Sequence, residues 1–176
     1  MTSDDERCRE IAAFRRIHDA YVRGDLDALR AALGDPPDFP NCRGPRAFGE
    51  APLEYAIYHS PLPFVRALLE LGADPNYEDH AGFPSLIAAL ASGRADTADL
   101  VRLLLSFGAD VGQRGVNDCT PLHWAAGADD APMIEILLAH GADPGARTRI
   151  DDYETPLEAA ERGGRTNAVR ALRGRG

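Results

Sequence analysis

The sequence contains no lysine, few cysteines and no long apolar run. All 19 basic residues are arginine, and together with abundant alanine, glycine, aspartate and proline this predicts a bacterial source with a GC-rich genome. The first ten residues lack the basic and apolar regions of a secretory signal. No apolar run approaches the roughly 20 residues that span a bilayer. We therefore expect neither a leader nor a membrane anchor.

The three cysteines, Cys8, Cys42 and Cys119, are odd in number and far apart. This pattern favours reduced thiols over a disulfide framework or a zinc site, and it predicts a cytoplasmic protein. The 176 residues are 44% hydrophobic and carry a net charge of -9, which fits one globular domain. Nucleic-acid binding needs clustered cations that displace counterions, so this charge argues against it and would suit a basic protein partner better.

A short motif recurs along the chain. Gly-Ala-Asp begins at Gly72, Gly108 and Gly141, each time after a leucine-rich stretch, with spacings of 36 and 33 residues. A glycine after an apolar periodic stretch supplies the left-handed residue that ends many helices. The motif therefore predicts the end of one helix in each repeat.

A second motif lies in fixed phase with the first. Its four copies are Ala51-Pro52-Leu53, Pro84-Ser85-Leu86, Thr120-Pro121-Leu122 and Thr155-Pro156-Leu157. Proline is tolerated in the first helical turn, and a threonine hydroxyl before it accepts a hydrogen bond from a free amide. Each copy therefore predicts the start of a helix. In the second copy we expect Pro84 and the Ser85 hydroxyl to take over this role.

The two motifs together resemble the ankyrin repeat, most closely from Thr120 to Asp143. The resemblance covers the chain from about Gly49 to the C-terminus and implies an all-α solenoid of stacked helix-turn-helix repeats with short hairpin fingers. Residues 46–176 would form about four repeats, the last a polar C-terminal cap, within one solenoid domain. Terminal repeats need such a solvated outer face because nothing stacks beyond them.

Residues 1–45 lack the motif but still predict a helical capping repeat. Ile11, Phe14, Ile17 and Tyr21 recur at helical spacing. Gly24 and Asp25 then mark a break and the start of a second short helix. The proline-rich segment 36–40 favours a stiff turn over a polyproline ligand.

Two copies depart from the ankyrin pattern by insertions. Residues 91–99 carry about three extra residues and predict a longer loop between the two helices of the third repeat. The finger from Arg147 to Glu154 is about two residues longer than its predecessors. Insertions in repeat proteins often lie on the binding face, so this finger is the first candidate for specialised contacts.

No catalytic, cofactor-binding or metal-binding group is predicted. The resemblance implies that His123 is structural and hydrogen-bonds a neighbouring loop, and that Trp124 packs towards an adjacent repeat. The remaining histidines form no i, i+4 pair, so no metal site follows. Adjacent acids such as Asp151 and Asp152 are usually solvated or cap a turn. We expect no enzyme activity and no cofactor.

The resemblance instead implies a protein-binding surface on the fingers and the exposed edge of the inner helices. Aromatic and arginine residues are enriched at binding hot spots, so Tyr58, Phe83, Arg114 and Arg147 are the preferred anchors. Phe83 has the alternative of packing under its own finger. The full predicted surface comprises Glu50, Tyr58, His59, Glu78, His80, Phe83, Arg114, Val116, Asn117, Cys119, Arg147, Asp151, Asp152 and Glu154.

The leading interpretation is thus a monomeric scaffold that binds another protein through its concave side. A narrower version is an immunity or antitoxin-like protein that masks a basic effector. A different class, a small-ligand-binding protein or enzyme, would need convergent polar groups with shifted pKa values in a pocket. Self-association through an uncapped end is the third alternative, and the charged ends of the chain argue against it.

Overall fold

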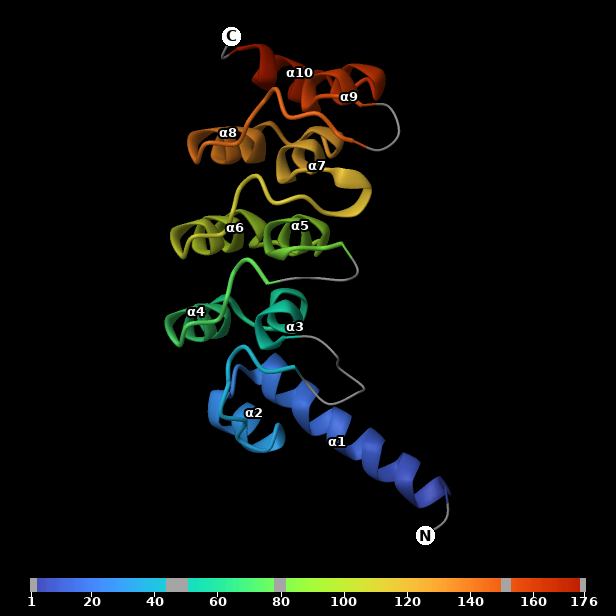
Figure 1. Ribbon diagram of the computed structural model, residues 1–176, viewed down its shortest axis with the longest axis vertical. Coiled ribbons are helices and arrows are strands. Elements are labelled where there is room, and N and C mark those ends of the chain that lie inside the picture. The colour runs from blue at the N-terminus through green and yellow to red at the C-terminus, as the bar shows by residue number, and fades with distance from the viewer. Residues whose placement is uncertain (1–2, 44–50, 78–81, 150–152, 175–176) are drawn as a thin grey trace. The chain divides into compact units, whose positions relative to one another are not determined.

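The computed structural model describes residues 3–43, 51–77, 82–149 and 153–174, with side chains from residue 7 onward. Within these ranges the chain forms ten α-helices, one 3-10 helix and no strand (Figure 1). This confirms the predicted all-α class. The α-helices are α1 (Ser3–Arg23), α2 (Leu26–Ala32), α3 (Pro52–His59), α4 (Leu62–Glu70), α5 (Ser85–Ala91), α6 (Thr97–Ser106), α7 (Pro121–Gly127), α8 (Ala131–Ala139), α9 (Pro156–Arg162) and α10 (Thr166–Arg173).

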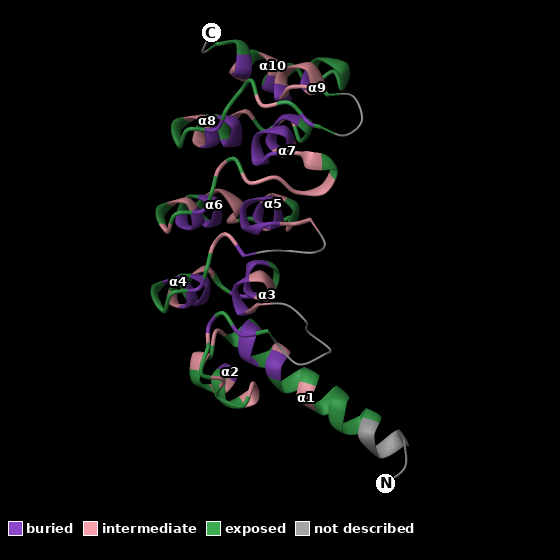
Figure 2. Cartoon of the chain, viewed as in Figure 1, coloured by how far each residue is buried: buried purple, intermediate pink, exposed green. Residues whose placement is uncertain are grey.

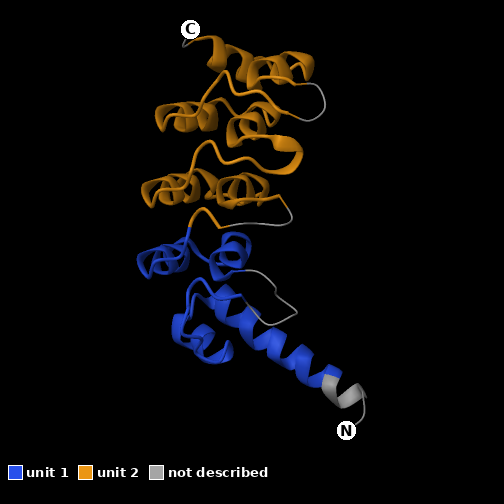
Figure 3. Ribbon diagram, in the orientation of Figure 1, with its two compact units in different colours: residues 1–74 blue, residues 75–176 orange. Residues whose placement is uncertain are grey.

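The helices belong to two compact units (Figure 3). Unit 1 spans Met1–Asp74 and contains α1 to α4, while unit 2 spans Pro75–Gly176 and contains α5 to α10. Within each unit the helices follow one another as antiparallel pairs joined by short loops (Figure 1). The predicted boundary near residue 45 lies outside the described residues and stays a prediction.

The helix starts follow the second motif, with one correction. Pro52, Pro121 and Pro156 each occupy the first turn of a helix. Thr155 Oγ1 accepts from the Glu158 amide (3.2 Å), and the Thr155 amide donates to Glu158 Oε2 (2.8 Å). In the second copy α5 begins at Ser85, directly after Pro84 at the N-cap, as expected. The predicted role of the Ser85 hydroxyl is wrong, because this residue is fully buried and its hydroxyl has no hydrogen-bond partner among the described residues.

The helix ends follow the first motif. Gly72, Gly108 and Gly141 have φ angles of 91°, 87° and 89°, the left-handed conformation that the motif predicts. In unit 2 the Asn76 side chain bridges the next such turn, donating to the Gly108 carbonyl (2.9 Å) and accepting from the Asp110 amide (2.7 Å). The chain thereby satisfies backbone groups that the helix end leaves open.

Unit 1 contains the same kind of asparagine bridge one repeat earlier. Asn41 donates to the Gly72 carbonyl (2.9 Å) and accepts from the Asp74 amide (2.8 Å). The segment before it folds as a turn, as predicted, with the Asn41 amide bonded to the Asp38 carbonyl (2.8 Å). The pair α1 and α2 therefore ends like a repeat, although it lacks the sequence motif.

The core of unit 1 leaves part of α1 uncovered. Ile17 and Tyr21 are buried. Figure 2 shows the buried part of α1 towards its C-terminal end. Ile11 and Phe14 belong to the same periodic pattern, but they are 46% and 39% exposed. The difference is consistent with the lengths of the two helices: α1 has 21 residues and α2 only 7, so α2 cannot cover α1 along its whole length.

The buried residues of unit 2 are mainly leucine, isoleucine and alanine. Figure 2 shows buried segments on each of the helices α5 to α8. Trp124 packs towards a neighbouring repeat, as predicted, with its ring 5.9 Å from that of Phe83, but it is only half-buried. The third repeat has the expected long loop, since α5 ends at Ala91 and α6 begins at Thr97. A bidentate ion pair from Arg94 to Asp96 (2.7 Å for both contacts) holds this loop.

Two leucines near the end of α4 test the assignment of the core. Leu68 is fully buried, while Leu71 is 48% exposed. Leu68→Ala should lower the free energy of unfolding by about 2–5 kcal/mol, because it leaves a cavity in unit 1. Leu71→Ala should cost less than about 1 kcal/mol. Urea titrations followed by circular dichroism measure both, and equal costs would contradict the described packing.

Candidate functional site

The candidate site is formed by two successive fingers of unit 2. One finger spans residues 113–119 and the other residues 147–154, of which 147–149 and 153–154 are described. In the first, the Gly115 amide donates to the Cys119 carbonyl (2.9 Å), and Val116–Asp118 form a 3-10 turn. In the second, the Thr148 amide donates to the Glu154 carbonyl (3.0 Å). The hydrogen bond that closes the second finger spans two more residues than the one that closes the first, consistent with the predicted insertion.

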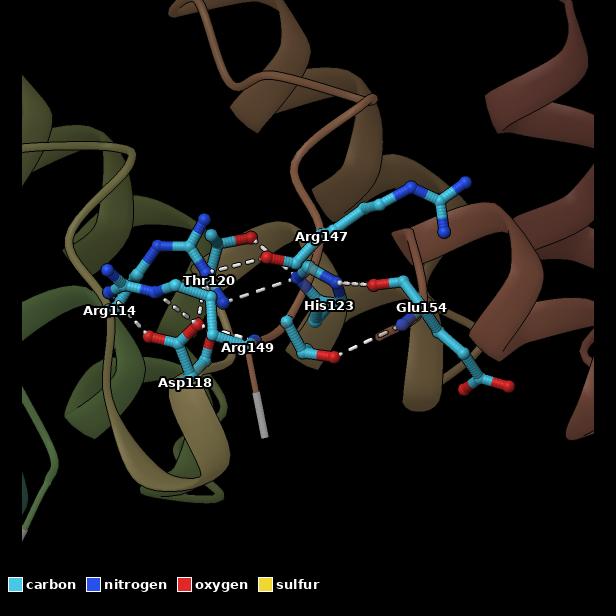
Figure 4. Close-up of polar contacts among 8 residues, drawn as sticks. Arg114, Asp118, Thr120, His123, Arg147, Arg149 and Glu154 are labelled. Carbon is cyan, nitrogen blue, oxygen red and sulfur yellow. Dashed lines mark hydrogen bonds and ion pairs between the residues drawn. The ribbon is translucent and has the colours of Figure 1, made fainter. Parts of the chain in front are cut away.

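The carboxylate of Asp118 ties the two fingers together (Figure 4). It accepts from the Arg149 amide (2.7 Å) and from both Nε (3.0 Å) and Nη2 (2.9 Å) of the same residue. Arg114 Nη1 adds a fourth contact (2.7 Å). The hydrogen bonds from Arg149, with the nearby Arg114 cation, lower the pKa of Asp118 to about 2, so it is ionised at neutral pH.

Arg114 extends the same connection to the backbone of the second finger. Its Nη1 group donates to the Asp118 carbonyl and to the Arg147 carbonyl, both at 2.9 Å. The side chain is therefore engaged within unit 2, although the sequence suggested it as an anchor for a partner. Its guanidinium group fixes the spacing of the fingers, and whether it also contacts a partner stays a prediction.

His123 links the start of α7 to the second finger, as the resemblance implied. Its Nδ1 accepts from the Thr120 amide (3.2 Å), and its Nε2 donates to the Glu154 carbonyl (3.0 Å), as Figure 4 shows. Burial, the largest influence, lowers the pKa of His123, which favours the neutral ring that this pattern requires. The ring thus satisfies two backbone groups from different repeats, and its structural role is confirmed.

Ion pairs also orient the far side of the second finger. Arg147 binds both carboxylate oxygens of Glu158 (2.9 and 3.0 Å) and donates to the Tyr153 carbonyl (2.8 Å). Glu154 forms a bidentate pair with Arg162, with both contacts at 2.7 Å. These contacts hold Tyr153 at a φ of 53°, which a bulky side chain rarely adopts. The residue is 61% exposed.

The structure places the predicted surface residues in three groups. Tyr58 and His59 lie exposed at the end of α3 in unit 1. Residues of unit 2 lie on or beside the fingers, where Asn117 and Arg147 are exposed and the others are half-buried. The members of this second group are Phe83, Arg114, Val116, Asn117, Cys119, Arg147 and Glu154. The third group, Glu50, Glu78, His80, Asp151 and Asp152, lies outside the described residues.

Sequence reasoning missed three residues of this site: Asp118, Arg149 and Tyr153. Asp118 and Arg149 are 31 positions apart, so only the stacking of the repeats reveals their contact. Tyr153 had a usable signal, because it is the one aromatic residue inside the lengthened finger. An aromatic residue in a loop insertion is a candidate anchor on general grounds.

The described part of the chain has no cluster of three or more histidine, cysteine or acidic residues that could hold a metal ion. Likewise, none of its helices is both long and apolar enough to cross a bilayer. The chemistry of the finger site is that of ion pairs and backbone hydrogen bonds. Such a site is suited to presenting a fixed surface.

Asp118→Asn tests the tie between the fingers. The variant should lower the free energy of unfolding by about 1–3 kcal/mol at pH 7, because it removes a charged acceptor of four hydrogen bonds. An aspartate whose pKa is lowered in the folded state contributes its full stabilisation above the pKa of the unfolded state. That contribution is lost as the pH falls through the lowered pKa of the folded state. The difference in the free energy of unfolding between wild type and Asp118→Asn should therefore shrink between pH 4 and pH 2.

Urea midpoints measured from pH 7 to pH 2.5 check this expectation. Asp99→Asn is the matched control, because the Asp99 side chain is 69% exposed and, among the described residues, pairs with Arg102 across the surface of α6. The contact between the fingers would be contradicted if Asp118→Asn lowers the free energy of unfolding no more than the control does. A loss that is constant with pH would contradict it too.

Comparison with protein families supports the architecture. Residues 86–176, more than half of the chain, match the family model described as ankyrin repeats in three copies. Residues 48–80 match the model of a single ankyrin repeat. The ankyrin repeat is a protein–protein interaction fold, and the two matches cover the segments in which the motifs recur.

Inversin is similar to this chain over part of its length. Human inversin is 33% identical over 114 residues, which is 61% of this chain and 10% of inversin. Dog inversin is 33% identical over 116 residues, or 62% of this chain and 10% of inversin. The matched part is thus about a tenth of the length of these relatives. With helix pairs, turns and finger contacts that all follow the repeat, the chain belongs to the ankyrin repeat family.

Proposed function

We propose that this chain binds a partner protein through the two fingers of unit 2 and the adjoining inner edges of α7 and α9. The observation that carries the proposal is the bidentate contact between Arg149 and Asp118, which joins successive fingers. Because the described parts of both fingers are held before any partner arrives, little of their conformational entropy is lost on binding. A fixed, extended surface of this kind is suited to a folded partner.

Exposed side chains on this surface supply the contacts. Tyr153 and Arg149 are the most exposed large residues described on the fingers, at 61% for Tyr153 and 72% for the Arg149 side chain. Tyrosine and arginine are the residue types that most often dominate binding energy. The strained backbone at Tyr153 adds support, because such conformations gather where function requires them.

The net charge of -9 adds a preference about the partner. The described start of the second finger carries Arg147 and Arg149, so the partner's basic residues would meet acidic residues elsewhere on the chain. Electrostatic complementarity of this kind mainly raises the rate of association. A basic partner, including an effector that the chain would mask, is therefore compatible with the proposal.

Tyr153→Ala tests the finger surface. We expect it to weaken the affinity for the partner about thirtyfold, the effect of losing a hot-spot side chain worth about 2 kcal/mol. The partner is first captured on immobilised wild-type chain from cells of the source organism and identified by mass spectrometry. The dissociation constant of the captured partner is then measured by interferometry for the wild type and for Tyr153→Ala. Arg102→Ala, on the exposed surface of α6, is the control and should change affinity less than twofold.

Two results would overturn the proposal. Equal affinity of wild type and Tyr153→Ala for the captured partner would remove the fingers as the binding site. A large thermal stabilisation by a metabolite or metal ion, with no protein captured, would replace protein binding by a small-ligand function. Circular dichroism and melting of each variant confirm that the fold is retained.

A further inference from the structure

We propose that a groove between α8 and α10 of unit 2 binds a small zwitterion, a ligand whose ammonium and carboxylate groups are joined by a short aliphatic chain. Glu135 on α8 holds the ammonium group, and Arg170 on α10 holds the carboxylate. We name this site the α8–α10 groove. It is independent of the proposed binding of a partner protein, because it contains none of the finger residues.

The groove lies where two helices of unit 2 pack side by side (Figure 1). It is open to solvent and has a volume of about 560 Å³, within the range of small-molecule sites. One face of each helix lines it, and on each face the lining residues recur at helical spacing. These residues are Ala131, Pro132 and Glu135 on α8, and Asn167, Arg170 and Ala171 on α10, followed by its C-cap, Gly174.

The groove brings together two opposite charges that the described fold leaves unused. Glu135 is the one charged residue of α8, and α10 contains two, Arg170 and Arg173. Arg173 pairs with Glu161. The side chains of Glu135 and Arg170 form neither an ion pair nor a hydrogen bond with a described residue, although both line the same groove. Both charges are therefore available to a ligand.

Most other arginines of unit 2 pair with a carboxylate. Of the nine arginines described in this unit, seven form such an ion pair. The eighth is Arg165. The hydrogen bond from the Ala168 amide, the largest influence, and the nearby Arg165 cation lower the pKa of Asp129. Arg170 is the ninth, and it lines the groove instead.

The two charges lie at a similar depth from a fixed end of the groove. Asp129, which also lines the groove, precedes α8 by two residues. Its carboxylate accepts from the Asn167 side chain and from the Ala168 amide near the start of α10, both at 2.8 Å. Glu135 and Arg170 are each the fifth residue of their helix. Because Asp129 is already engaged, Glu135 is left to bind an ammonium group.

A zwitterion matches both walls of the groove. Its ammonium group would donate to Glu135 and its carboxylate would accept from Arg170, and hydrogen bonds between charged groups are stronger than neutral ones. The small apolar side chains of Ala131, Pro132 and Ala171 would contact the methylene groups between the charges. A phosphate or a simple cation fits less well, because each would meet a like charge on one wall.

Titration with ε-aminocaproate tests the groove directly. The full isotope-labelled chain is titrated, and the backbone amide shifts are followed by NMR. We expect saturable shifts of amides in α8 and α10, with a dissociation constant on the order of 1 mM, as is usual for a ligand of this size. Hexylamine and hexanoate each lack one of the charges and should bind about tenfold more weakly. Equal binding of either would overturn the zwitterion.

Neutral substitutions test the two charged residues. Glu135→Gln and Arg170→Gln should each weaken the binding of ε-aminocaproate about tenfold, because each removes one charged partner of the ligand. Asp99→Asn and Arg102→Gln are the matched controls at exposed positions of α6, and they should leave the affinity unchanged. Equal affinities of the groove variants and the controls would contradict the proposal.

An exchange of the two charges gives the sharpest variant. Glu135→Arg alone and Arg170→Glu alone should each abolish binding, since two like charges then line the groove. The double variant again presents one charge of each sign, so it should bind ε-aminocaproate in the reverse orientation with nearly the wild-type affinity. A purely structural role of these residues predicts no such rescue. A double variant that binds no better than the single ones would overturn the assignment of the two walls.

Two further ligands identify the source of the zwitterion. An acetylated peptide that ends in lysine carries the same pair of charges, and its C-terminal amide lacks the carboxylate. Tighter binding of the acid form than of free lysine assigns the groove to protein C-termini, whereas the reverse order assigns it to free amino acids. Equal binding of the acid and amide forms would contradict the role of Arg170.

The test is separate from that of the finger surface, because the shifts locate the ligand. Tyr153→Ala should leave the binding of ε-aminocaproate unchanged. Absence of binding by all of these ligands, or shifts that map outside α8 and α10, would overturn the groove while leaving the finger proposal intact. Circular dichroism and melting curves show whether each variant keeps its fold.

Discussion

The structure depends on one constraint: a pair of short helices cannot bury its apolar residues without a neighbouring pair. Helices of 7 to 10 residues make up each motif-bearing pair, and isolated helices of this length are marginal in water. Stacking within a unit removes the apolar faces from solvent. Stacking also brings loops of successive repeats side by side, and their backbone groups then need partners. The polar contacts of the fingers meet that need.

The finger contacts explain how a stability requirement could also prearrange the proposed binding surface. Within unit 2, His123 donates a hydrogen bond across a repeat boundary, and Asp118 accepts one. The same contacts fix where the exposed residues Arg149 and Tyr153 stand. On the proposed function, a partner would therefore meet a surface whose geometry the repeat stack within unit 2 sets. Selection for tight stacking and for a prearranged site would act on the same residues.

Local features of the fold were predictable, whereas contacts across repeats were not. The motifs around Pro121 and Gly108 predicted a helix start and a helix end, since proline placement and left-handed glycine are local properties. Periodicity correctly placed Ile11 and Ile17 on one helix, but it did not reveal that Ile17 is covered by neighbours while Ile11 is 46% exposed. Likewise, the Asp118–Arg149 pair depends on how two repeats stack. The preference for a basic partner, drawn from net charge alone, stays a prediction.

The central claim is that the fingers of unit 2 are ordered before a partner binds. Hydrogen exchange of backbone amides in the isolated chain measures this directly. The amides of Gly115, Thr148 and Arg149, which donate within and between the fingers, should exchange at least a hundredfold more slowly than in an unstructured peptide. Exchange of these amides at the unstructured rate, while the amides of α7 stay protected, would contradict the claim.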